Sequence, residues 1–354
     1  MPTLASTAPS RPLDVAIVGV TGAVGAELIA CLEKRAFPVG RLRALASPRS
    51  AGARLETPWG ALAVEAVEDD SFAGADCAFF SAGAGVSRRF APAATQRGCV
   101  VVDNSSAFRM DLGTPLVVPE VNGALLDANP RLVANPNCTA AVSVMALAPI
   151  HARNPIRRVI GATYQAASGA GAAAMAELTQ STRAWLAGEP FQPKVLPHPY
   201  AFNLFSHTTP IDPVTGYNDE ETKVMAEIRR ILDAPGLRIS VTCVRVPVLR
   251  AHSVSLSLEC ERAVAPEEVV EWLSQAPGVR LVNDAATNHF PMPAEASGLD
   301  EVLVGRIRRD LSDPDGRTIS LFLSGDQLLK GAALNAVQIA ERLFAKGGGN
   351  GRLS

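Results

Sequence analysis

The sequence predicts an α/β protein of two domains, in which a parallel, doubly wound sheet is followed by an α+β domain. The chain of 354 residues is about two domains long, and its composition of 47% hydrophobic and 19% charged residues suits a large core. Up to about residue 138, short apolar runs alternate with helix-like segments, which is typical of a parallel sheet. Later strand-like runs are longer and alternate in polarity, which favours an antiparallel or mixed sheet with helices on one face.

The first domain opens with a predicted strand at residues 14–19 (DVAIVG), followed by a glycine turn and a helix over residues 26–35. The turn is Gly19-Val-Thr-Gly22-Ala-Val-Gly25, whose glycines let a ligand approach the backbone closely. The start of the helix supplies N–H donors for a pyrophosphate. This order of elements is typical of a dinucleotide-binding unit, although a merely tight turn is the alternative. Further strands are predicted at 42–45, 77–80 and 99–102.

The loop after the second predicted strand bears on the choice of cofactor. NAD-selective sites usually carry an Asp or Glu about 20 residues after the turn, where it binds the ribose 2′-hydroxyl. Residues 44–50 contain no acid and place Arg49 between Ser47 and Ser50. A guanidinium flanked by hydroxyls suits a 2′-phosphate, so the sequence favours NADP over the alternative of an ordinary solvated loop.

The second domain is predicted from a series of strands and a final helix. Residues 327–346 have apolar residues at helical spacing, and the glycine-rich end after them is expected to fray. The Ala- and Gly-rich segment 166–176 contains Ser168 and is interpreted as a functional loop. The predicted strands are 157–164, 238–247, 253–261, 301–307 and 317–323.

Composition excludes several classes of function. Lys and Arg number 33 against 35 Asp and Glu, a formal net charge of −2, so no general attraction to nucleic acid or anionic lipid is expected. No apolar run approaches the roughly 18 residues of a membrane span. Residues 1–12 lack the features of a secretory signal, and we expect a loose tail on a soluble cytoplasmic protein. The six cysteines form no C-x-x-C pair, so neither a metal site nor a disulfide framework is predicted.

One cysteine has the surroundings of a nucleophile. Cys138 lies in the polar turn Asn135-Pro-Asn-Cys-Thr139, directly before an apolar helix-like run whose dipole would favour the thiolate. A base must come from elsewhere, and the chain has five histidines. His252 follows Arg245 at a predicted bend between two strands, so the two side chains are expected to lie close together. From the residues alone, a buried structural role for His252 is at least as well supported.

Five motifs in this order resemble the aspartate-semialdehyde dehydrogenase family. They are Thr21-Gly22-Ala23-Val24, Asp103-Asn-Ser-Ser-Ala-Phe-Arg109, Asn135-Pro-Asn137-Cys138-Thr, Thr163-Tyr-Gln165-Ala-Ala-Ser168-Gly169-Ala-Gly171, and Arg245-Val-Pro-Val followed by His252-Ser. The resemblance spans residues 14 to 344. It implies a Rossmann-type NADP-binding domain (13–138 plus 327–346) and a catalytic and dimerisation domain (139–326). The last helix would return to the first domain, the chain would form a homodimer, and disordered tails would occupy residues 1–12 and 347–354.

The family's reaction is the NADPH-dependent reductive dephosphorylation of 4-phospho-L-aspartate to L-aspartate 4-semialdehyde, in lysine, methionine and threonine biosynthesis. The resemblance implies that Cys138 forms a thioester, that Gln165 orients the acyl group and that His252 is the general acid/base. A Cys–His pair suits this chemistry, because a base raises the thiolate fraction.

The resemblance also assigns groups to the two anionic ends of the substrate. Arg245 would bind the α-carboxylate bidentately, and Arg109 and Lys223 would bind phosphate. Glu220 would contact the substrate ammonium, although Glu220 and Lys223 on one helix face also suit a routine surface ion pair. Asn137, next to the nucleophile, is a further expected substrate-binding residue.

The cofactor-binding residues come from these motifs, from the glycine turn, from the loop at 44–50 and from Gln327, which occupies a place where Asn or Gln is expected. Gly19, Thr21, Gly22, Ala23 and Val24 would hold the pyrophosphate, Ser47, Arg49 and Ser50 the 2′-phosphate, and Ser168, Gly169 and Gln327 the nicotinamide. Arg250 departs from the pattern, because a small residue is expected there, and it leaves the shape of the pocket open.

Three rival functions are considered. N-acetyl-γ-glutamyl-phosphate reductase shares the plan, but would carry Gly-Cys-Tyr-Pro at the nucleophile where this chain has Asn137-Cys138-Thr139-Ala140. Malonyl-CoA reductases are more distant. A non-catalytic paralogue acting as a binding scaffold would have no need of Cys138, Gln165, Arg245 and His252 together.

Overall fold

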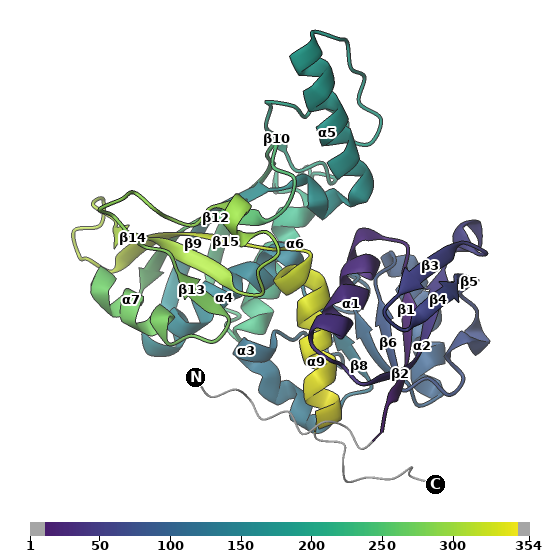
Figure 1. The fold of residues 1–354 in the computed structure, drawn as a ribbon. Coiled ribbons are helices and arrows are strands. Elements are labelled where there is room, and N and C mark those ends of the chain that lie inside the picture. Colours follow the sequence, from purple (N-terminus) through teal and green to yellow (C-terminus); the bar gives the residue numbers. More distant parts are fainter. Residues whose placement is uncertain (1–10, 346–354) are drawn as a thin grey trace. The chain divides into compact units, whose positions relative to one another are not determined.

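The computed structural model describes residues 11–345 (Figure 1). These residues form two compact units, one of residues 11–136 with 332–345 and the other of residues 137–331. The expected tail residues 1–10 and 347–354 lie outside the described residues, whereas Arg11 forms an ion pair with Asp76. No helix within residues 11–345 is long and apolar enough to cross a membrane.

Six parallel strands form the central sheet of the first unit, which confirms the predicted doubly wound sheet. Their order is β5-β2-β1-β6-β7-β8. The central strands are buried on both faces, which explains their continuous apolar runs. The strands are β1 (Leu13–Val18), β2 (Val39–Ala46), β5 (Glu65–Ala66), β6 (Cys77–Phe80), β7 (Val100–Asp103) and β8 (Leu132–Ala134).

Several short strands of this unit were not predicted from the sequence. β5 and β8 are too short to produce an apolar run. An antiparallel hairpin of β3 (Arg54–Thr57) and β4 (Gly60–Ala63) is mostly exposed and therefore carries little hydrophobic signal.

The last helix belongs to the first unit, as predicted. It packs against α1, where Arg35 forms an ion pair with Glu341 at 2.7 Å and the rings of Phe37 and Phe344 meet edge to face. The helices of the unit are α1 (Ala23–Lys34), α2 (Ala84–Gln96), α3 (Pro119–Asn122) and α9 (Leu334–Ala345), with the 3-10 turns η1 (Pro48–Ser50), η2 (Asp69–Phe72) and η3 (Gly123–Ala128).

The second unit is built on a mixed sheet of seven strands, in agreement with the α+β prediction. Its order is β10-β11-β9-β12-β15-β14-β13, and β9 pairs parallel with β11 but antiparallel with β12. β11 ends at Arg245, short of the predicted end, since Pro247 cannot donate to the ladder. The strands are β9 (Ile156–Gln165), β10 (Phe205–Ser206), β11 (Arg238–Arg245), β12 (His252–Cys260), β13 (Val279–Leu281), β14 (Val302–Arg309) and β15 (Thr318–Gly325).

Three helices of this unit, α4 (Cys138–Arg153), α6 (Asp219–Ile231) and α7 (Pro266–Ser274), pack against the sheet. The predicted functional loop at 166–176 is a loop only in its first half, because after the 3-10 turn η4 (Ala167–Ala170) its alanines begin α5 (Ala172–Ala187). In Figure 1, α5 stands away from the sheet of its own unit. A short helix, α8 (Pro293–Ala296), completes the unit.

The helix expected from residue 327 begins differently. Gln327 lies in a turn, Leu329–Ala333 form a π-helix (η5), and regular α-helix starts only at Leu334. The cause is Asp326, whose side-chain Oδ1 accepts from the backbone N–H of Leu328 while its carbonyl accepts from Gly331, five residues ahead. A π-turn of this kind is frequent at functional sites.

Candidate active site

The glycine turn of the first unit has the geometry of an anion-binding loop. Gly19 has a φ of +86°, and a Cβ atom there would lie 2.8 Å from the carbonyl oxygen of Ser81. A Cβ atom on Gly25 would lie 2.5 Å from the carbonyl oxygen of Val20. α1 begins at Ala23 with no side-chain cap on Gly22 and no acidic residue in its first turn. Its positive end therefore fits a pyrophosphate.

The predicted 2′-phosphate loop follows β2 directly. Ser47 and Arg49 are exposed and Ser50 is half-buried, and residues 48–50 form the turn η1. The loop presents one guanidinium and two hydroxyls with no carboxylate among residues 44–50. These groups fit a phosphate on the 2′-oxygen better than a bare ribose hydroxyl.

Cys138 is the first residue of α4, and Asn137 caps that helix. The Asn137 side-chain oxygen accepts from the backbone N–H groups of Thr139 (2.9 Å) and Ala140 (3.1 Å). Cys138 is half-buried, and the positive helix end favours an anionic sulfur. The other five cysteines are buried, and burial raises the pKa of Cys99 and Cys243 to about 12. Only Cys138 therefore has the surroundings of a nucleophile among the six.

Two glutamates of α6 hold the residues around the nucleophile. The Glu220 carboxylate accepts from the side-chain amides of Asn137 and Gln165, each at 3.0 Å. Glu227 accepts from the backbone N–H of Asn137 at 2.5 Å. Burial opposes the charged form of Glu220, but the two amide hydrogen bonds and the nearby charge of Arg245 lower its pKa. Glu220 is thus tied to the nucleophile turn rather than to a routine pair with Lys223.

Gln165, the last residue of β9, is also fixed by its neighbours. Its amide nitrogen donates to Glu220 and to the hydroxyl of Thr139 at 2.9 Å. The side chain is buried and reaches the first turn of α4 through Thr139. Gln165 therefore lies next to the turn that carries Cys138.

Arg245 and His252 meet at Gly169, as the predicted bend between their strands requires. A Cβ atom on Gly169 would lie 2.9 Å from both Arg245 Nη1 and His252 Nε2, so only glycine fits between them. Arg245 Nη1 donates to the carbonyl oxygen of Ala166 at 3.1 Å, and the Ala166 N–H donates to His252 Nδ1 at 3.0 Å. One peptide segment thus orients both side chains.

The protonation state of His252 follows from these contacts. Because Nδ1 accepts a backbone hydrogen bond, the neutral ring carries its proton on Nε2. Burial, with the nearby charge of Arg245, holds the pKa of His252 well below its usual value. Within the described residues, buried His252 Nε2 and Arg245 Nε have no hydrogen-bond partner, so both could donate to a ligand.

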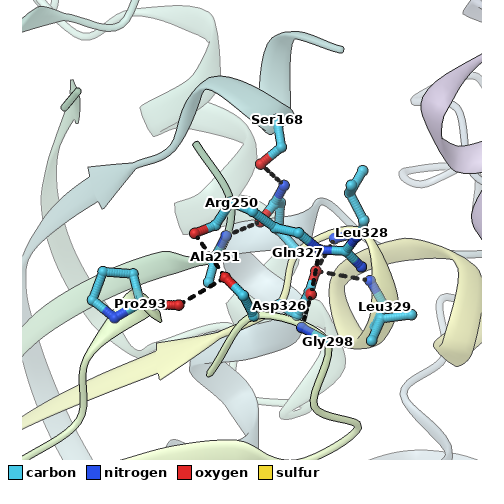
Figure 2. Close-up of polar contacts among 10 residues, drawn as sticks. Ser168, Arg250, Ala251, Pro293, Gly298, Asp326, Gln327, Leu328 and Leu329 are labelled. Carbon is cyan, nitrogen blue, oxygen red and sulfur yellow. Dashed lines mark hydrogen bonds and ion pairs between the residues drawn. The ribbon is translucent and has the colours of Figure 1, made fainter. Parts of the chain in front are cut away.

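Gln327 and Ser168 lie together, and both the nitrogen and the oxygen of the Gln327 amide form hydrogen bonds (Figure 2). Its amide nitrogen donates to the Ser168 hydroxyl, and its oxygen accepts from the backbone N–H of Ala251 at 3.0 Å. Gln327 therefore links the Ser168 turn to the residue before His252. Contact with a nicotinamide remains a prediction for both side chains.

The structure resolves the question raised by Arg250. Its guanidinium pairs with the fully buried carboxylate of Asp326 at 2.6 Å, which also accepts from the backbone N–H of Gly298 (Figure 2). Asp326 caps the turn that precedes the π-helix. Arg250 is thus bound to the framework behind His252.

The two predicted phosphate ligands belong to different units. Arg109 is buried in the first unit, where Nε donates to the carbonyl oxygen of Asn135 at 2.9 Å and Nη2 to that of Asn104 at 2.7 Å. Lys223 is half-buried on α6, one turn after Glu220. That Arg109 and Lys223 bind the same phosphate stays a prediction. Among residues 11–345, no group of three or more His, Cys, Asp or Glu side chains is arranged to hold a metal ion.

Two buried residues of this cluster were not predicted from the sequence. His207 accepts a hydrogen bond from Arg245 through Nε2 at 2.8 Å, and Glu227 holds the backbone of Asn137. For Glu227 the signal is its position two turns after Glu220 on one face of α6. His207 lies in an irregular segment and carries no comparable signal.

The chain is similar to known proteins over nearly its whole length. A family model described as "Semialdehyde dehydrogenase, NAD binding domain" matches residues 14–128, and one described as "Semialdehyde dehydrogenase, dimerisation domain" matches residues 147–330. The chain is 50% identical to aspartate-semialdehyde dehydrogenase of Synechocystis sp., over 95% of this chain and 98% of that relative.

Solved structures are also similar. Aspartate semialdehyde dehydrogenase II of Vibrio cholerae, complexed with ASA, is 38% identical with a TM-score of 0.90, over 95% of this chain and 99% of that one. The Candida albicans enzyme, solved with NADP, shares the fold at 21% identity and a TM-score of 0.73, over 95% of this chain and 99% of that one.

Proposed function

The chain belongs to the aspartate-semialdehyde dehydrogenase family, and we propose that it converts 4-phospho-L-aspartate to L-aspartate 4-semialdehyde and phosphate with NADPH. The observation that carries this proposal is one cluster in residues 137–331. It places Cys138 at a helix start braced by Gln165 and Glu220, and sets Arg245 and His252 on either side of Gly169. A nucleophile, an oxyanion donor and a carboxylate-binding cation are the groups that this reaction needs.

The cysteine step exchanges phosphate for sulfur at the acyl carbon. The Cys138 thiolate would attack that carbon, the carbon–oxygen bond to phosphate would break, and phosphate would leave. NADPH, when bound, supplies the hydride that reduces the acyl group to the aldehyde level. The carbon–sulfur bond would then break, which releases the aldehyde and restores the thiolate at the start of α4.

His252 suits the role of a hydrogen-bond donor in this sequence. Its Nδ1 is occupied by the Ala166 N–H, so its exchangeable proton is on Nε2. We propose that Nε2–H donates to the oxyanion of each tetrahedral intermediate, and that the helix start, rather than His252, favours the thiolate. The lowered pKa keeps this donor neutral at neutral pH.

The remaining groups would hold the two ends of the amino acid. Arg245 has an Nε–H without a partner among the described residues, and this donor is suited to the α-carboxylate. Glu220, ionised because its pKa is lowered, would attract the substrate ammonium. Arg109 and Lys223 are proposed to bind the phosphate.

NADP is the proposed cofactor. The uncapped turn before α1 fits the pyrophosphate, and the loop with Ser47, Arg49 and Ser50 fits the 2′-phosphate. A protein of the same fold has been solved with NADP.

We also propose that the chain acts as a homodimer in the cytoplasm. The strand β9 exposes Ile160 and Tyr164, and the Tyr164 ring lies 5.9 Å from that of Phe322 on β15. Exposed apolar side chains on a sheet face suit a partner surface, and the matched family model is described as a dimerisation domain. Sedimentation of the wild type and of Ile160→Asp tests this, because a buried charge would give monomers only if this face is the interface.

One assay tests the activity. NADPH formation is measured with NADP, phosphate and either aspartate semialdehyde or N-acetylglutamate semialdehyde. Phosphate-dependent turnover of the first alone is expected, since Glu220 is proposed to bind a free ammonium, which the N-acetylated substrate lacks. Turnover of the N-acetylated substrate, or of neither, would contradict the proposal.

A further inference from the structure

Arg245 is held by a histidine that the proposed mechanism does not use. Arg245 Nη2 donates to His207 Nε2 at 2.8 Å, and both side chains are buried, at 4% and 8% exposure. Arg245 ends β11, and His207 directly follows β10, the strand that pairs antiparallel with it. The backbone N–H of His207 donates to the carbonyl oxygen of Cys243, so the sheet register sets the distance between the two side chains.

The contact fixes the protonation of His207. A guanidinium only donates, so Nε2 must accept and the ring proton must lie on Nδ1. Nδ1 faces the hydroxyl of Thr209 at 3.3 Å, and that hydroxyl accepts from the backbone N–H of Glu220. The chain of contacts therefore runs from the start of α6 through Thr209 and His207 to Arg245.

The charges around His207 favour the neutral ring that this contact needs. Burial and the charges of Arg245 and Lys223 lower its pKa, Glu220 opposes them, and the net result is a pKa of about 4. At neutral pH His207 is therefore an acceptor and adds no positive charge beside Arg245.

Two anchors hold the guanidinium plane. Nη1 donates to the carbonyl oxygen of Ala166 and Nη2 to His207, while Nε–H has no partner among the described residues. Ala166 fixes one corner of the group, but one anchor alone would allow the plane to rotate about that contact. With both anchors, the side chain keeps one orientation before the ligand arrives, which reduces the entropy lost on binding.

We propose that His207 is a positioning residue that orients Arg245 for the α-carboxylate of the amino-acid substrate. The inference rests on the proposed function, in which Arg245 meets that carboxylate. It adds a residue that determines specificity and lies outside the five motifs. A guanidinium held in one orientation selects a ligand by the planar shape of its carboxylate as well as by its negative charge.

The test compares three replacements of one ring. In His207→Gln the side-chain oxygen can occupy the place of Nε2, whereas in His207→Asn it reaches only the place of Nδ1. We expect His207→Asn and His207→Ala to raise the KM for aspartate semialdehyde about 10- to 100-fold, because the arginine loses an anchor beside the reacting carbon. His207→Gln should stay within about threefold of the wild type. The KM values for phosphate and NADP should change little in all three variants.

A double-mutant cycle shows whether His207 acts through Arg245. In an Arg245→Lys background, His207→Asn should have little further effect on the semialdehyde KM, because the guanidinium that it orients is absent. His198→Asn is the matched control, since His198 is exposed in the same segment, and it should behave as the wild type. Circular dichroism and thermal unfolding of each variant establish that it is folded.

Two results would overturn the proposal. One is a wild-type semialdehyde KM in folded His207→Asn and His207→Ala. The other is an equal loss in His207→Gln and His207→Ala that extends to all three KM values, as a general structural role would produce. Failure of the proposed function is distinct, because the wild type itself would then show no phosphate-dependent oxidation of aspartate semialdehyde.

Discussion

Gly331 lies directly against Cys138: a Cβ atom built on Gly331 would be 2.8 Å from the Cβ atom of Cys138 and 3.1 Å from its Cα. The contact depends on the π-turn at Leu329–Ala333, which Asp326 caps. The nucleophile is therefore held from behind by backbone, and its side-chain position depends on a residue without a Cβ atom.

Gly331→Ala tests this packing. The added methyl group must displace Cys138 or the π-turn, so we expect the free energy of unfolding to fall by about 1–3 kcal/mol. A shift of the sulfur by about 1 Å would also lower kcat on the order of a hundredfold. Gly236→Ala is the control, because a Cβ atom there meets nothing within 4 Å. Unchanged kcat in Gly331→Ala would show that the sulfur does not depend on this contact.

Cys138→Ser tests the nucleophile. The variant should fold normally and lose at least about a thousandfold in kcat, because an alcohol is a far weaker nucleophile than a thiolate at neutral pH. Steady-state kinetics and circular dichroism measure the two effects. Iodoacetamide should label Cys138 first and substrate should slow that labelling, since burial raises the pKa of Cys99, Cys243 and Cys260 to between about 11 and 12. Retention of activity in Cys138→Ser would rule out the thioester.

Local patterns predicted the framework, but not the elements that depend on distant side chains. β1, its glycine turn and α1 were predictable, because a buried apolar run and the spacing of Gly19, Gly22 and Gly25 are local signals. The π-turn was not predictable, since Asp326 sets it through a side-chain cap and is itself held by Arg250. A helical apolar pattern alone cannot distinguish a π-turn from an α-turn.

The residues of the candidate site likewise divide into those that a local motif predicts and those that depend on distant contacts. Cys138, Gln165, Arg245 and His252 lie at the ends of strands or at a helix start, where motifs are visible in the sequence. His207 reaches the site only because β10 pairs with β11, and a strand of two residues leaves no pattern to read. The tautomer of His252 likewise depends on a backbone N–H that no motif indicates.

Arg49→Ala tests the cofactor loop. Arg49 is exposed and lies beside Ser50, so its removal should not destabilise the fold. A charge-assisted contact to the 2′-phosphate contributes roughly 1.5–3 kcal/mol, so the KM for NADP should rise about 10- to 150-fold while that for NAD changes little. Equal changes in both KM values, or a wild type that prefers NAD, would contradict the interpretation of this loop.

The buried histidines make stability depend on pH. His207 has a pKa lowered from 6.5 to about 4 in the folded protein, so the unfolded chain binds its proton first. The contribution of His207 to the free energy of unfolding should therefore be fully present above about pH 6.5 and should decrease as the pH is lowered toward 4. Urea unfolding between pH 4.5 and 7.5 measures the slope, which should be shallower in His207→Gln. An equal slope in both proteins would mean that His207 keeps an ordinary pKa.

Arg245→Lys and Lys223→Ala separate the two ends of the substrate. Lys223→Ala should mainly raise the KM for phosphate in the oxidative direction, because it removes a half-buried cation from α6. Arg245→Lys keeps the charge but should damage semialdehyde turnover on the order of a hundredfold, because an ammonium cannot present the guanidinium fork. Lysine would also lose one of the contacts to Ala166 and His207 that hold Arg245 in place.

Kinetics with each substrate varied in turn provides the measurement. Arsenate should substitute for phosphate in the wild type and show the same raised KM in Lys223→Ala, since it has the same shape and charge. Arg245→Lys should leave the KM for arsenate near its wild-type value, because the proposed carboxylate site is separate from the phosphate site. If Arg245→Lys raised only the phosphate and arsenate KM values, with semialdehyde kinetics unchanged, Arg245 would bind phosphate and the two anion sites would have to be exchanged.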